Sequence, residues 1–184
     1  EQSALSAWVA GGGVLFITGD IYNKTSYNSF GSGFGVGNFT DASGAVAIVG
    51  NHPLLNGVTS LAGTTYVSFT HGADAKLLAT VANKPFAAVL DNTSGYAGGG
   101  CVLVVGDHNI FTQGFVANGN NTQFLQNVVA WVNTCAGAPN NNGTPCTLDS
   151  QCTNKFCVDG VCCNNACAGG ASDCLTDSRP STGH

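Results

Sequence analysis

The stretch GGGVLFITGD, residues 11–20, decides the fold, because it places a continuous apolar run between glycines and a Gly-Asp pair. An apolar run of this length is typical of a strand that is buried on both faces of a sheet. The same plan returns in GGGCVLVVGDH, residues 98–108. We therefore expect two core strands, over residues 14–18 and 101–105, that end in similar tight turns.

Helical and strand patterns surround these two runs. Leu5, Trp8 and Val9 have helical spacing before the first run, and the apolar positions after Asn121 predict a helix of about 12 residues. Residues 21–43 are rich in Gly, Asn and Ser and are expected to form a long loop. Further strands are expected over 45–49, 64–69, 76–81 and 86–91. These elements predict an α/β fold with an open, mostly parallel sheet and flanking helices.

The last quarter of the chain is distinguished by seven cysteines between Cys146 and Cys174. This segment has too few large apolar residues to fold around a hydrophobic core, so the dense cysteines indicate a small disulfide-stapled module made in an oxidising compartment. The expected organisation is an α/β domain over 1–135, a linker over 136–145, the cysteine-rich module over 146–174 and a tail over 175–184.

The cysteines outside that module are Cys101 and Cys135, which either bridge to each other or remain a buried thiol and a partner for the module. We expect all nine cysteines to be candidates for disulfide bonding. Because nine is odd, at least one must be unpaired or bonded to another chain. A zinc site using Cys152 and Cys157, or Cys163 and Cys167, is the disfavoured alternative, because the extracellular composition favours disulfides. The complete set is Cys101, Cys135, Cys146, Cys152, Cys157, Cys162, Cys163, Cys167 and Cys174.

The charge composition excludes several classes of partner. Only 8% of the 184 residues are charged, against about 25% in an average globular protein, and the net charge is -5. Five basic residues argue against nucleic acid and against a polybasic membrane surface. No apolar run reaches the ~20 residues of a membrane-spanning helix. The chain has no methionine and opens on a helix-like segment, so we expect further sequence upstream.

Two parts of the chain resemble known families. Residues 5–134 resemble the non-catalytic bacterial branch of glutamine-amidotransferase-like α/β domains, through LSAWVAGGGVLFITGD, NHPLLNGV, the Lys84–Val89 strand, and GGGCVLVVGDHNIF followed by NTQFLQNVVAWV. The resemblance implies a flavodoxin-like sheet that is truncated at its N-terminus. The tail is similar to a cysteine-rich repeat of large secreted bacterial surface proteins, through the patterns C-x-x-D-x-x-C and F-C-V-D-G-V-C-C-N.

Catalytic members of the amidotransferase-like group need a cysteine on a strand-to-helix elbow, activated by a histidine and a carboxylate. Gly19-Asp20 offers no thiol at the elbow, Glu1 is the only glutamate, and Cys101 begins its strand instead of ending it. Phosphate-binding glycine motifs are also absent from the sequence. We therefore predict no catalytic residue and no cofactor. A hydrolase using Asp20 and Asp107 as paired carboxylates remains a less favoured hypothesis.

Four polar residues are candidates for ligand binding: Asp20, His52, Asp107 and His108. The two Gly-Asp turns should meet at the carboxyl edge of the sheet, where open α/β sheets bind ligands. The alternative is that both aspartates only cap turns. Metal-ligand spacings such as H-x-H or a calcium loop are missing, so no metal is predicted.

The favoured function is a secreted or cell-surface structural module that acts without catalysis. Its partners would be copies of itself or other surface proteins in a matrix, adhesin or filament, because a sparsely charged surface opposes close packing little. The alternative is a carbohydrate-binding domain at the carboxyl edge. In that case four loop aromatic residues would either stack on sugar rings or anchor the loop: Tyr22, Tyr27, Phe30 and Phe34.

Overall fold

The computed structural model describes residues 2–22, 24–96 and 99–135, and residues 152, 156–158 and 160–163 of the cysteine-rich part. By internal contacts the chain divides into two compact units, Glu1–Cys135 and Ala136–His184. The predicted linker 136–145, the predicted tail 175–184 and Cys146, Cys167 and Cys174 lie outside the described residues.

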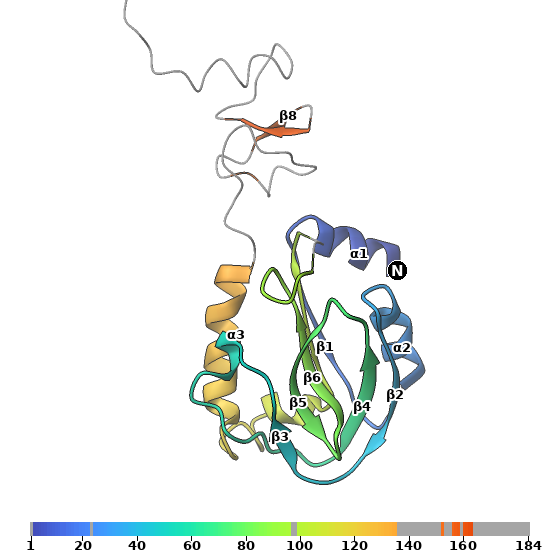
Figure 1. Ribbon diagram of the computed structural model, residues 1–184, viewed down its shortest axis with the longest axis vertical. Coiled ribbons are helices and arrows are strands. Elements are labelled where there is room, and N and C mark those ends of the chain that lie inside the picture. The colour runs from blue at the N-terminus through green and yellow to red at the C-terminus, as the bar shows by residue number, and fades with distance from the viewer. Residues whose placement is uncertain are drawn as a thin grey trace, which may run out of the picture. The chain divides into compact units, whose positions relative to one another are not determined.

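A five-stranded sheet organises the first unit (Figure 1). Its order is β1 (Val14–Thr18), β7 (Cys101–Val105), β6 (Lys84–Leu90), β5 (Lys76–Val81) and β3 (Val46–Ile48). Only β1 and β7 are parallel, and every other neighbouring pair in this sheet is antiparallel. The prediction of an open, mostly parallel sheet is therefore wrong.

The short connection between β5 and β6 explains why these two strands are antiparallel. β5 and β6 are joined by Ala82 and Asn83 alone, whose φ angles of 49° and 62° fit a tight hairpin turn. A parallel pair would need a crossover of a dozen or more residues, for which a two-residue connection leaves no room. Ala-Asn lacks the glycine that usually marks such a turn, so this hairpin was not predicted from the sequence.

The segment 21–43, expected to be a loop, contains α2 (Lys24–Ser32) and β2 (Val36–Ala42). β2 pairs antiparallel with β4 (Tyr66–His71) to form a separate two-stranded sheet. Aromatic side chains fix this layer: the Phe39 ring lies 5.8 Å from Tyr27 and 5.4 Å from Phe69. Tertiary packing thus orders a stretch whose glycines and asparagines favour turns.

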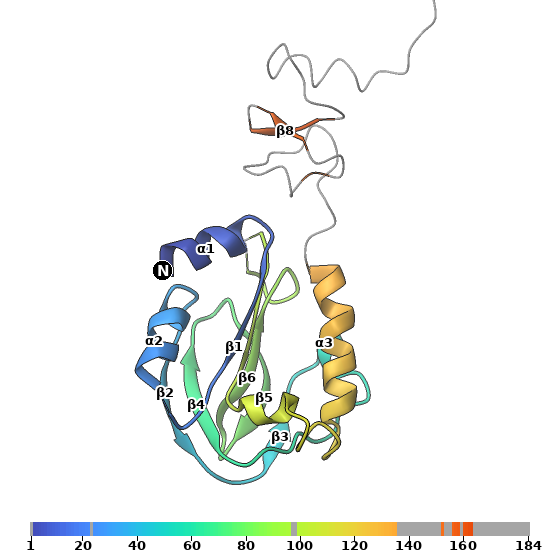
Figure 2. The ribbon, with the colours of Figure 1, turned by 180° about the vertical axis from the view of Figure 1, so that it is seen from behind.

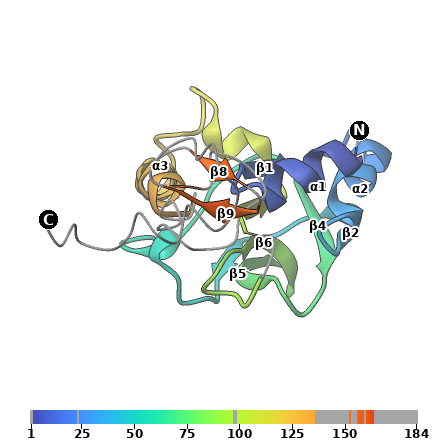
Figure 3. The ribbon, with the colours of Figure 1, turned by 90° about the horizontal axis from the view of Figure 1, so that it is seen from above.

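The five-stranded sheet is covered on both faces. Alternation along β7 sends Val102 and Val104 into one core and Leu103 and Val105 into the other. The first core lies under α1 (Gln2–Ala10), α2 and the β2–β4 sheet, and the second lies under α3 (Asn121–Cys135) with the short helices η1 (Pro53–Leu55) and η2 (His108–Phe111). Figure 3 shows α1 and α2 together on one side of β1 and α3 on the other.

The described part of the second unit is a small hairpin. β8 (Cys157–Val158) pairs antiparallel with β9 (Val161–Cys162), and Gly160 lies in the turn with φ of 81°. A disulfide joins Cys152 to Cys162 with the two Cα atoms 5.3 Å apart, and Cys157 and Cys163 are also disulfide-bonded. In the ranges that the structure describes, none of the helices has the length and apolar character needed to cross a membrane.

Candidate functional site

The carboxyl edge of β1 and β7 brings two of the four predicted ligand residues together. β1 and β7 run parallel and in register, so the turns that follow them reach the same edge of the sheet. There His108 Nδ1 lies 3.1 Å from Asp20 Oδ2, and the His108 N–H donates to the Gly19 carbonyl at 3.1 Å. The side chain of His108 is 43% exposed, so this pair is reachable from solvent.

Asp107 lies at the same edge but is fully buried. Its Oδ1 accepts from the Asn109 N–H at 2.8 Å, and its Oδ2 accepts from the Thr64 N–H at 3.1 Å. A Cβ atom on Gly63 would collide with the Asp107 carboxylate, so the backbone of Gly63 also packs directly against this side chain. Asp107 therefore caps η2 and holds the loop before β4, and it does not face solvent.

His52 lies at the opposite end of the sheet. Its partner Asp91 directly follows β6, and the antiparallel register of Leu90 with Val102 puts that position beside the start of β7. The two side chains are buried, with His52 Nε2 2.9 Å from Asp91 Oδ2. The structure therefore does not place His52 with the other three predicted ligand residues.

Asp91 is the centre of a buried hydrogen-bond network that the sequence analysis did not single out. Trp131 Nε1 of α3 donates to Asp91 Oδ2 at 2.9 Å, alongside His52. Asp91 Oδ1 accepts from the Thr93 N–H, the Thr93 hydroxyl and the Ser94 N–H at 2.8, 2.7 and 3.1 Å. Burial alone would raise the pKa of the Asp91 carboxyl, but the hydrogen bonds from His52, Trp131 and Thr93 outweigh it and hold that pKa far below its ordinary value.

Both ring nitrogens of His52 are engaged in this arrangement. Nδ1 accepts from the Leu54 N–H at 3.2 Å, which caps η1, and Nε2 faces Asp91. An imidazole that accepts at Nδ1 carries its proton on Nε2 and donates it to the carboxylate. The network therefore joins η1, the end of β6 and α3, and its role is structural.

An outer edge of the sheet offers a second kind of site. β1 is an end strand, and the Gly13 carbonyl before it accepts from the Cys101 N–H at 3.1 Å. Because alternate residues of a parallel ladder bond to the neighbouring strand, the N–H and C=O groups of Val14, Phe16 and Thr18 point away from β7. Within residues 2–22, 24–96 and 99–135, these outward groups have no hydrogen-bond partner. β1 thus presents an open backbone edge.

Exposed aromatic side chains follow the same strand. Trp8 lies against Gly13 and is 61% exposed, Phe16 is 43% exposed at the centre of β1, and Tyr22 is 70% exposed just beyond it. Trp8 and Tyr22 are mostly exposed, whereas the Phe16 ring also packs edge-on against Trp131 of α3, with the ring centroids 6.2 Å apart. In Figure 2, β1 runs down the near side of the unit, with α1 and α2 on one side and α3 on the other.

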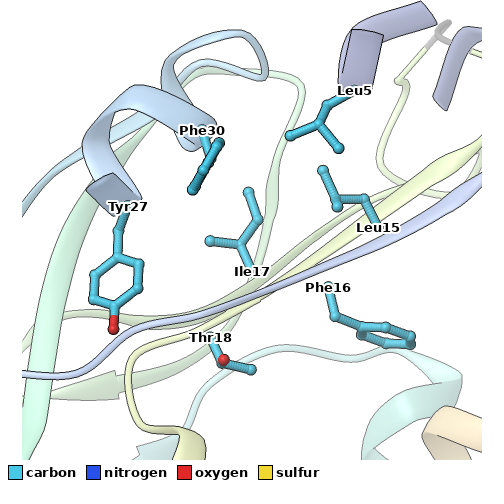
Figure 4. A pocket seen from close by; sticks show the side chains of 7 residues that line it. All are labelled: Leu5, Leu15, Phe16, Ile17, Thr18, Tyr27 and Phe30. Carbon is cyan, nitrogen blue, oxygen red and sulfur yellow. The ribbon is translucent and has the colours of Figure 1, made fainter. Parts of the chain in front are cut away.

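An apolar pocket of about 310 Å³ lies beside the open edge. Figure 4 shows Leu5 of α1 and Phe30 of α2 on the same side of β1 as Leu15 and Ile17, whereas the side chains of Phe16 and Thr18 point to the other face of the strand. Burial and the negative charge of Asp20 raise the pKa of Tyr27, so its hydroxyl stays neutral at ordinary pH. The lining residues are Leu5, Leu15, Phe16, Ile17, Thr18, Tyr27 and Phe30. Tyr27 and Phe30 therefore line this pocket, while Phe34 is buried in the core.

Disulfide bonding is confirmed by two described pairs. The first joins Cys101 at the start of β7 to Cys135 at the end of α3, with the Cα atoms 6.1 Å apart, and the second is Cys152–Cys162. The Cys101–Cys135 disulfide links the end of α3 to the start of β7, at the same end of the sheet as the Asp91 network. Among the residues that the structure describes, no group of three or more His, Cys, Asp or Glu side chains could hold a metal ion.

The comparisons with known proteins show a likeness of fold and nothing finer. No family model matches the chain, and no curated protein matches it. Similar solved structures include the mmIFT52 N-terminal domain, with 12% identity and a TM-score of 0.54 over 72% of this chain and 70% of that one. Cytoplasmic Protein STM3548 from Salmonella typhimurium has 18% identity and a TM-score of 0.53, over 71% of this chain and 59% of that one.

A third similar structure is the β-galactosidase from Rahnella sp. R3. It has 18% identity and a TM-score of 0.50, over 78% of this chain but only 22% of its own. These likenesses concern the arrangement of the chain alone, because identity is below 20% in each case. The amidotransferase-like and cysteine-rich-repeat resemblances stay predictions.

Proposed function

We propose that this chain is a non-catalytic interaction module of a secreted or cell-surface protein, and that it docks through the β1 edge. The observation that carries the proposal is the open backbone of Val14, Phe16 and Thr18 beside exposed Trp8 and Phe16 and an apolar pocket. An unpaired strand edge is a template for a further strand, and aromatic residues are enriched at the centres of interfaces.

The disulfides support the extracellular part of the proposal. Bonded cysteines persist in oxidising compartments and are rare in the cytosol. Six described cysteines are disulfide-bonded, which fits a protein that acts outside the cytosol. The sparse charge of the chain also suits a surface that packs closely against another protein.

The polar residues of the sheet support the non-catalytic part. Asp107 and His52 are both committed to caps and buried hydrogen bonds, which leaves Asp20 and His108 as the accessible polar pair from the predicted set. The pair has the Asp–His geometry that would orient a general base. In the described ranges, however, no hydrogen bond joins His108 to a hydroxyl or thiol that could act as a nucleophile.

Peptide binding tests the proposal. The probe is a labelled synthetic peptide of residues 13–19 with lysines added at its ends for solubility. We expect it to bind the oxidised full chain in an anisotropy titration and to shift the amide resonances of β1. Phe16→Lys should abolish binding, whereas Val49→Lys, at an exposed position beyond β3, should not. Absence of binding to the wild-type chain at about 1 mM peptide, weaker than typical specific recognition, would refute docking at this edge.

Carbohydrate binding at the carboxyl edge is the second candidate. It is favoured by the exposed ring of Tyr22 close in sequence to Asp20, whose carboxylate lies against half-exposed His108. A sugar ring would stack on the tyrosine while its hydroxyls bond to the pair. A glycan array that gives signals lost in both Asp20→Ala and Tyr22→Ala would favour this candidate, and an array without signals would count against it. Asp107 is unsuitable for this test because it is buried.

A further inference from the structure

We infer that the strand that occupies the β1 edge is β1 of a second copy of this chain, paired antiparallel about a two-fold axis at Phe16. The inference rests on the proposed function and names its partner. It would join the two five-stranded sheets into one continuous sheet across the axis. Isologous pairing of this kind is the commonest symmetry of homo-oligomers.

The backbone of β1 is self-complementary in this arrangement. Phe16 presents both its N–H and its C=O outward, so two copies of Phe16 placed opposite each other exchange two hydrogen bonds. Val14 and Thr18 lie two residues before and after Phe16. Val14 of each copy would therefore lie opposite Thr18 of the other copy, and each of these two pairs would exchange two hydrogen bonds. The pairing forms about six backbone hydrogen bonds without a bulge or a change of register.

The side chains do not oppose this pairing. Residues 2–19 contain no charged residue and no proline, so neither like charges nor a missing N–H separates the two strands. Natural proteins protect outer strands with lysines, prolines, bulges or short length. Those devices are missing from β1, and its central residue carries the aromatic ring of Phe16, which is 43% exposed on the face of the sheet that also carries Trp131. Aromatic side chains directly opposite each other stabilise antiparallel pairs.

The other edge of the same sheet shows the contrast. β3 has only three residues, and beyond it the N–H groups of Val49 and Gly50 both donate to the Leu78 carbonyl, at 3.0 and 3.1 Å. Two donors on one acceptor break the regular ladder, so a further strand cannot continue in register there. The sheet therefore has one protected edge and one open edge.

The exposed aromatic area indicates the strength of the association. A fully exposed aromatic side chain presents about 150–250 Å², so the exposed fractions of Trp8, Phe16 and Tyr22 amount to roughly 350 Å² in one copy. Two copies remove roughly 700 Å² from these side chains, which corresponds to a small interface of below about 1,200 Å² in total. We expect a reversible dimer that forms between about 1 μM and 1 mM.

Sedimentation velocity of the full chain under non-reducing conditions tests the inference. Wild type is compared with Phe16→Lys, which places two lysines opposite each other at the axis, and with Val49→Lys, which adds the same charge at the protected edge. We expect at least an about 100-fold increase in the dimer dissociation constant for Phe16→Lys and none for Val49→Lys. Trp8→Lys is a second variant, at a position outside the sheet, and it should increase the dimer dissociation constant by about 10-fold. Circular dichroism establishes that each variant is folded.

The outcomes separate this inference from the proposed function. A wild-type chain that stays monomeric at about 1 mM but binds the peptide of residues 13–19 would overturn self-pairing and keep docking at the edge, whereas failure of both experiments would overturn both. Equal weakening by Phe16→Lys and Val49→Lys would place the interface elsewhere. A dimer that separates only under reduction on a denaturing gel would be disulfide-linked, and it would also overturn pairing through β1.

Discussion

Replacing Asp91 with alanine should remove a large part of the stability of the first unit. The carboxylate accepts five hydrogen bonds, and two of the donors, His52 Nε2 and Trp131 Nε1, are buried at 2.9 Å. A buried donor that loses its acceptor costs about 1–3 kcal/mol, because water cannot replace the lost partner. For the two buried donors we expect a total loss of about 3–5 kcal/mol, out of the 5–15 kcal/mol that a domain of this size ordinarily has.

Urea unfolding followed by circular dichroism, under non-reducing conditions, measures this loss. With an m-value of about 2 kcal/mol/M, a loss of about 4 kcal/mol lowers the unfolding midpoint by about 2 M. Asp74→Ala removes an exposed carboxylate and serves as the control, with an expected change within about 0.5 kcal/mol. Asp91→Asn keeps the shape but puts an amide N–H₂ group toward one set of donors, so its effect should lie between those of the other two variants.

The pH dependence gives an independent check on the same carboxylate. The pKa of Asp91 is lowered in the folded state, so its contribution to stability is present above the unfolded pKa of about 3.9 and is lost as the pH falls toward the folded pKa. In that acid range the free energy of unfolding should fall by up to about 1.4 kcal/mol per pH unit from this group, and Asp91→Asn should lack this component. An Asp91→Ala variant as stable as Asp74→Ala, or an unchanged acid slope in Asp91→Asn, would refute the reasoning.

Three further predictions follow from other contacts. Replacing both Cys101 and Cys135 with alanine should destabilise the first unit by about 4 kcal/mol in the chain-entropy model, since the bond spans 34 residues; equal midpoints for oxidised wild type and the double variant would contradict this. Gly106→Ala would place its Cβ against the Val67 carbonyl and should lower the free energy of unfolding by at least about 3 kcal/mol in thermal or urea unfolding. A variant as stable as wild type would show that β4 does not approach Gly106 this closely. Asp20→Asn acts on a partly exposed pair and should change stability by less than about 1 kcal/mol; a larger loss would indicate a structural role for it.

The sequence predicted the elements whose pattern is strong and local. β1 and β7 are uninterrupted apolar runs between glycines, and α3 has a continuous apolar stripe, so each lies where it was expected. The antiparallel direction of β5 and β6 was not accessible in the same way, because it depends on the Ala82-Asn83 turn, which lacks the usual glycine.

Contacts between residues far apart in the chain were the second feature that the sequence did not predict. Asp91 meets His52 and Trp131 across sequence separations of 39 and 40 residues, and a single chain gives no local signal for such a meeting. Proximity of Asp20 and His108 was predictable, because both follow strands that end at one edge. The openness of β1 was not predictable, because the strand reads as buried on both faces and only the sheet order places it at the end.

Residue-resolved amide hydrogen exchange as a function of protein concentration tests the central claim most directly. The N–H groups of Leu15 and Ile17 face β7 and should exchange slowly at every concentration. Those of Val14, Phe16 and Thr18 face outward and should exchange quickly in dilute protein, then slow by at least about 10-fold as the dimer forms, because a hydrogen-bonded amide exchanges only when its structure opens. Rapid exchange of the three outward amides at all concentrations up to about 1 mM would contradict pairing through β1.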